Sequence, residues 1–126
     1  MAETFLKAGG LYNIAFALLH AFSWWLFNWK EELRKLSSMN EANVQVLNYC
    51  VTFTFVIFGY ISLAHTRELL GTPLGRVLLM LMTLFWFARA MGQLLLFDRD
   101  DWGSWLLFAL FAIGAALYAF PALLVA

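Results

Sequence analysis

Four long apolar runs, separated by short polar connections, dominate the chain. The runs cover about residues 8–29, 44–65, 73–97 and 102–125. Each matches the roughly 20 mostly apolar residues that a helix needs to cross a bilayer. Strands of a membrane barrel alternate polar and apolar positions, and these runs are continuous, so they predict helices.

Start and stop signals refine the ends of the predicted helices. The segment Ser38-Met39-Asn40-Glu41 fits a capping box, so the second helix is expected to begin near Met39 and to continue to about residue 70. Gly71-Thr72-Pro73 ends it and starts the third helix. Asp98-Arg99-Asp100-Asp101 predicts a tight turn before the fourth. The four helices are therefore expected at about residues 8–29, 39–70, 73–97 and 102–125.

Short connections favour antiparallel neighbours, as in an up-down-up-down bundle. The predicted fold is therefore all-α: an integral-membrane, antiparallel four-helix bundle with four transmembrane helices. No internal repeat or second set of elements interrupts the pattern, so residues 1–126 are expected to form a single domain.

Composition supports a membrane protein and excludes several functions. The chain is 63% hydrophobic and 13% charged, whereas soluble domains are about half apolar and about one quarter charged. The formal net charge is zero, and no basic patch of the kind that binds nucleic acid is evident. The single cysteine excludes an intrachain disulfide and a cysteine metal cluster, and no metal site is predicted.

Aromatic residues indicate where the helix ends lie relative to the membrane interfaces. Tryptophans flank the first and third connections, whereas Tyr12, Tyr60 and Tyr118 fall toward the opposite ends of the helices and are expected near that interface. The first run exceeds the about 7–15 apolar residues of a cleavable signal, so it is expected to be retained. We expect a bacterial inner membrane with both termini on the same side, the cytoplasmic side being favoured.

Polar residues recur at steps of three and four within the first three apolar runs, as expected of faces that pack against neighbouring helices. Ionisable groups inside a bilayer are costly and often mark functional sites. At about 1.5 Å rise per residue, several of these side chains could share one layer. The predicted ligand-binding residues are His20, Ser23, Asn48, Thr52, Trp86, Arg89 and Gln93.

This layer suggests binding of a small amphiphile, such as a lipid or a quinone-like molecule. Arg89 would pair with an anionic or carbonyl group, and Trp86, three residues earlier, could form a cation–π contact with it. His20 would hydrogen-bond or exchange a proton. The same polar groups could instead bond between helices as structural links, or Arg89 could extend toward the interface.

Two other function classes stay open. One is an accessory or assembly subunit of a larger membrane complex, or a homo-oligomer, whose contact surface is a small-residue face of the fourth helix: Ala109, Ala112, Ala116 and Ala119. The other is a membrane haem protein or enzyme that uses His20. No carboxylate lies inside a run and no HExxH, P-loop or GxGxxG motif is present, so neither a catalytic residue nor a cofactor is predicted.

Overall fold

The computed structural model describes residues 1–97 and 100–125, and its regular elements over these residues are all helical. Three helices, α4, α6 and α7, are long and apolar enough to cross a membrane. The all-helical, membrane-type chain predicted from the sequence is therefore confirmed. The elements are α1 (Ala2–Ala21), α2 (Ser23–Leu26), α3 (Trp29–Glu32), the 3-10 helix η1 (Leu33–Lys35), α4 (Ser38–Ala64), α5 (Thr66–Gly71), α6 (Pro73–Leu96) and α7 (Trp102–Leu124).

The first predicted helix, over residues 8–29, is wrong at both ends. The helix α1 begins at Ala2 and stops at Ala21, where Phe22 leaves helical geometry with φ −99° and ψ 12°. After α2, Asn28 adopts the left-handed conformation with φ 52°, which asparagine tolerates better than most residues. The chain then turns back through α3 and η1, and the buried Leu33 anchors it beside α4.

The second predicted helix is divided in two. Its cap is Ser37 rather than Ser38: the Ser37 hydroxyl accepts a hydrogen bond from the Asn40 amide at 3.2 Å. The long helix α4 ends at Ala64, and His65, with φ −121° and ψ 37°, separates it from the short helix α5.

The third and fourth helices lie close to their predicted positions. Pro73 is the first residue of α6, as predicted, and the Thr72 hydroxyl accepts from the Gly75 amide at 2.9 Å. The Asp101 carboxylate caps α7 by accepting from the Gly103 amide at 2.9 Å. Asp98 and Arg99 of the predicted turn lie outside the described residues.

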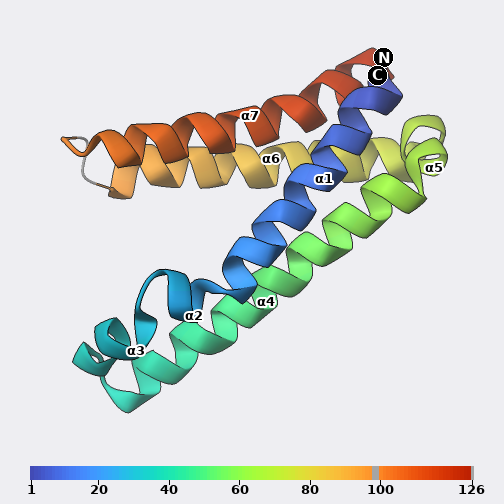
Figure 1. Cartoon of the computed structure of the whole chain (residues 1–126). Coiled ribbons are helices and arrows are strands. Elements are labelled where there is room, and N and C mark those ends of the chain that lie inside the picture. Colours follow the sequence, from blue (N-terminus) through green and yellow to red (C-terminus); the bar gives the residue numbers. More distant parts are fainter. Residues whose placement is uncertain (98–99, 126) are drawn as a thin grey trace.

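The long helices form two antiparallel pairs that diverge from a common end (Figure 1). One pair is α1 with α4, the other is α6 with α7, and α1 packs on α7 where the pairs meet. The ring centres of Phe5 in α1 and Phe120 in α7 lie 4.4 Å apart at this end. The helix α3 and the start of α7 lie at the opposite, open end. A regular four-helix transmembrane bundle is therefore not confirmed.

Two tyrosines pack reciprocally where α1 crosses α7. Tyr118 of α7 lies against Gly9 of α1, where an added Cβ would approach the phenol ring to 2.9 Å. Tyr12 of α1 lies against Gly114 of α7, where an added Cβ would come within 2.6 Å of the ring. A side chain at either glycine would push the helices apart, so these two positions permit the close crossing.

Beside the crossing lies a buried polar cluster formed by Asn13, Ser62 and Tyr118, which are all fully buried. The Asn13 amide Nδ2 donates to the Gly9 carbonyl at 2.9 Å and to the Tyr118 hydroxyl at 2.7 Å. The Ser62 and Tyr118 hydroxyls are also 2.7 Å apart. The cluster connects α1, α4 and α7, so Tyr118 is buried between helices instead of facing lipid, and its depth near the membrane interface stays a prediction.

We predict that Tyr118→Phe destabilises the protein by about 1 kcal/mol, within the about 0.6–1.7 kcal/mol expected of hydrogen bonds between membrane helices. The substitution keeps the ring but removes the hydroxyl that bonds to Asn13 and Ser62. The free energy of unfolding in mild detergent would measure the loss. Tyr60→Phe is the matched control, because Tyr60 is exposed; equal effects of the two substitutions would contradict the prediction.

Candidate functional site

Trp86 lies at the centre of an aromatic stack between the two helix pairs. It has no exposed surface. The ring of Phe55 from α4 stacks on it at 5.1 Å with an interplanar angle of 16°, and the ring of Phe111 from α7 does so at 6.0 Å and 17°. Phe16 of α1 also contacts it at 5.4 Å. This stack (Phe16, Phe55, Trp86, Phe111) therefore lies between the predicted polar residues of the α1–α4 pair and those of α6.

On one side of the stack, His20 and Asn48 form a doubly bonded pair between α1 and α4. The His20 ring Nδ1 lies 2.9 Å from Asn48 Oδ1, and Asn48 Nδ2 donates to the His20 backbone carbonyl at 2.8 Å. Because that carbonyl can only accept, it fixes the orientation of the amide, and Oδ1 must accept from the ring. Neutral His20 is therefore protonated on Nδ1, which leaves Nε2 as an acceptor.

Thr52 and Ser23 belong to the same helix pair, but their hydroxyls are engaged locally. Thr52 donates to the Asn48 carbonyl at 2.8 Å, and Ser23 donates to the Leu19 carbonyl at 3.2 Å. Such bonds to the preceding turn satisfy a hydroxyl within an apolar environment. Thr52 is therefore linked to the backbone of Asn48, and no hydrogen bond between described residues joins either hydroxyl to the His20 ring or the Asn48 side chain.

On the other side of the stack, Arg89 and Gln93 form a polar chain between α6 and α7. The Arg89 guanidinium donates to Gln93 Oε1 at 3.2 Å, and Gln93 Nε2 donates to the Ser104 hydroxyl at 3.1 Å. The guanidinium carbon lies 4.2 Å from the ring centre of Phe111 and 5.5 Å from that of Phe97. The predicted cation–π contact with Trp86 is thus replaced by contacts with these two phenylalanines.

The structure divides the seven predicted residues between the two helix pairs. It brings His20 to Asn48 and Arg89 to Gln93, and no hydrogen bond between described residues joins one group to the other. Trp86 lies between them as part of the stack. Binding of a ligand by these residues stays a prediction.

Two contributors to the Arg89 site were not predicted from the sequence. Phe111 carries no polar signal, and only the antiparallel packing of α7 along α6 places it under the guanidinium. Ser104 offered a weak signal, because it is a polar residue early in an otherwise apolar helix. Among the described residues, no group of three or more histidine, cysteine or acidic side chains could hold a metal ion.

The chain matches no family model, no curated protein and no solved structure.

We predict that the ring nitrogen shifts of His20 show the Nδ1-protonated form, and that Asn48→Leu abolishes this preference. The substitution removes the oxygen that accepts from Nδ1. Two-dimensional ¹H–¹⁵N NMR of the labelled histidines in micelles would distinguish the Nδ1-protonated from the Nε2-protonated ring in the unsubstituted protein and in Asn48→Leu. Asn43→Leu on the exposed face of α4 serves as the control; an Nε2-protonated His20 in the unsubstituted protein would refute the assignment.

Proposed function

We propose that this protein is an integral-membrane protein that binds a small amphiphile, a lipid or a quinone-like molecule, through Arg89. The observation that carries the proposal is the state of the Arg89 guanidinium. It is half-buried within a helix long and apolar enough to span a membrane, and no carboxylate among the described residues pairs with it. An arginine in a span is costly, and such residues usually line a functional site.

The surroundings of Arg89 favour an anionic or carbonyl group as its partner. An arginine carries five N–H donors in a planar fork, which suits carboxylate and phosphate groups. One donor is used by Gln93, and the aromatic rings of Phe97 and Phe111 cover part of the cation without accepting further strong hydrogen bonds. The remaining donors are available to a headgroup oxygen.

The depth of Arg89 suits an amphiphile rather than a free ion. It lies seven positions before the end of α6 at Leu96, which is roughly 10 Å at helical rise. Its hydrogen bond to Gln93, one turn further along, directs it toward the connection between α6 and α7. A headgroup held there would leave its apolar chain among the exposed leucines and phenylalanines of the same helix pair.

In this proposal α1 acts as the fourth span. Its charged first two turns, in which Lys7 and Glu3 form an exposed ion pair at 3.1 Å, would lie outside the bilayer. The apolar remainder of α1 packs along α4. A bacterial inner membrane with cytoplasmic termini remains the expected location.

A second candidate is an accessory subunit, and one observation favours it. Ala109 and Ala116 are exposed and Ala112 and Ala119 are partly exposed, so the small-residue face of α7 is incompletely covered within the chain. Small residues allow another helix to approach closely. This candidate predicts that Ala116→Leu changes the oligomeric or complexed mass and that Arg89 substitutions do not.

We predict that native mass spectrometry from mild detergent detects an adduct whose occupancy falls roughly tenfold or more in Arg89→Gln, because a charge-assisted hydrogen bond is lost. Arg76→Gln is the matched control, because Arg76 is exposed at the start of the same helix. Far-UV circular dichroism would confirm that both variants are folded. A spectrum of the unsubstituted protein without an adduct, or equal loss in both variants, would argue against the proposal.

A further inference from the structure

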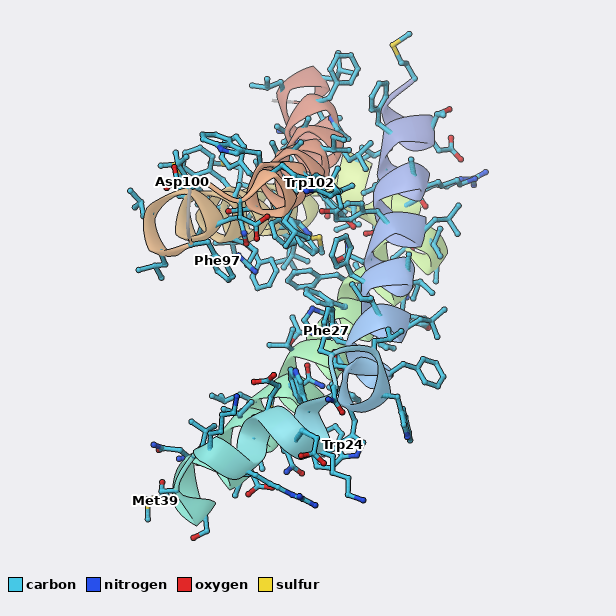
Figure 2. The ribbon with its side chains drawn as sticks, turned by 60° about the vertical axis from the view of Figure 1, so that its left-hand side comes forward. Trp24, Phe27, Met39, Phe97, Asp100 and Trp102 are labelled. Atoms are coloured by element: carbon cyan, nitrogen blue, oxygen red, sulfur yellow. The ribbon has the colours of Figure 1, made fainter. Side chains whose placement is uncertain are left out.

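An aromatic pocket lies at the open end of the α1–α4 pair, away from the Arg89 site. Its volume is about 230 Å³. Three tryptophans and a tyrosine line much of it, together with two amide side chains and an alanine: Trp24, Trp25, Trp29, Tyr49, Gln45, Asn48 and Ala21. Figure 2 shows Trp24 on this arm of the molecule, with Phe97 and Trp102 on the other.

The local fold explains why the aromatic residues gather there. The end of α1 at Ala21 and the left-handed Asn28 turn the chain back, so that α2 and α3 pack on each other beside α4. Trp24 and Trp25 come from α2 and Trp29 comes from α3, while α4 and the last residue of α1 supply the remaining wall. An uninterrupted helix through residue 29 would spread the three tryptophans along its length. The pocket therefore depends on the two backbone breaks.

The chemistry of the lining favours a cation without strong hydrogen-bonding needs. None of the lining residues is charged, so an anion would find no opposite charge. Both polar atoms of the Asn48 amide already bond to His20. Aromatic faces attract cations, and cages of tryptophan and tyrosine are the recurrent means of binding quaternary ammonium groups.

We propose that this pocket binds a quaternary ammonium group of the choline type. The volume lies just below the about 300–1,000 Å³ of pockets that enclose whole small-molecule ligands, so it suits a headgroup rather than an entire lipid. Gln45, whose side chain has no hydrogen-bond partner in the described part of the chain, can bond to an adjoining ester or hydroxyl oxygen. The group can come from a phosphocholine lipid or from a soluble organic cation. The proposal does not depend on ligand binding at Arg89, which lies on the other helix pair.

The test is saturation-transfer NMR of the trimethylammonium protons of choline, titrated against the full-length protein in maltoside micelles. We expect a saturable signal that potassium chloride at equal ionic strength does not displace. Replacing Trp24 or Trp25 with leucine should weaken binding roughly two- to fivefold for each ring removed, as for cation–π contacts at exposed sites. Trp102→Leu is the matched control, because Trp102 is an exposed tryptophan on α7.

Tyr49→Leu provides a second variant on the rigid helix α4, should the substitutions in α2 disturb folding as judged by circular dichroism. A second experiment distinguishes a phosphocholine lipid from a soluble organic cation. Phosphatidylcholine or phosphatidylglycerol is added to the micelles, and native mass spectrometry compares how much of each lipid the protein retains. Retention of phosphatidylcholine, displaced by choline, would identify a lipid headgroup, and choline binding without it would identify a soluble cation. The absence of a saturable choline signal, or an equal signal in the folded Trp24→Leu, Trp25→Leu and Tyr49→Leu variants, would overturn the proposal.

Discussion

The reciprocal packing of two tyrosines against two glycines is the contact on which the arrangement of the helix pairs depends. Tyr12 lies over Gly114 and Tyr118 lies over Gly9, so α1 and α7 approach most closely at one short stretch. Interiors are packed too densely for a bulkier residue to enter such a contact without displacing its neighbours. The helices therefore cross at this point rather than running side by side, and the α1–α4 and α6–α7 pairs diverge beyond it (Figure 1).

The divergence explains why the polar residues of the predicted layer form two groups. Sequence position gives the depth of a residue along its helix, but not the angle at which two helices cross. His20 and Arg89 have comparable predicted depths, yet they lie on different helix pairs, and the stacked rings of Phe55, Trp86 and Phe111 lie between them. Within each pair the prediction was more successful, because antiparallel neighbours with short connections leave little freedom. The contact between His20 and Asn48 follows from that geometry, and the contact between Arg89 and Gln93 follows from their spacing of four residues on α6.

The steps of three and four expected of packing faces recur among the buried residues of α1, α4 and α6. Gly9, Asn13 and Phe16 in α1 are buried, as are Phe55, Gly59 and Ser62 in α4, and Gly75, Leu79, Met82, Trp86 and Gln93 in α6. The distribution of aromatic residues did not predict the burial of Tyr118, because the amphipathic tyrosine side chain suits both a membrane interface and a buried site with a hydrogen-bond partner. The apolar pattern failed after Ala21, where apolar sequence continues but the backbone does not remain helical. Asn28 takes the left-handed conformation at that break, and the chain after it returns to α4 through η1.

The two proposed sites illustrate how a small membrane protein can recognise groups of opposite character with few charged residues. At Arg89 the protein supplies the charge and uses Phe97 and Phe111 to cover it. At the aromatic pocket the ligand supplies the charge and the rings accept it. Arg89 lies in the last third of α6, and the aromatic pocket is lined by α2, α3 and the first half of α4, so each site lies in the part of its helix pair that is nearer the open end. Because each is built within a different helix pair and they share no residue, the effects of substitutions in the two should be additive. Asn48 is the exception within its own pair, since it bonds to His20 and lines the aromatic pocket. A ligand in that pocket would therefore alter the hydrogen bonds of His20, which pass through the Asn48 amide, and would leave those of Arg89 unchanged.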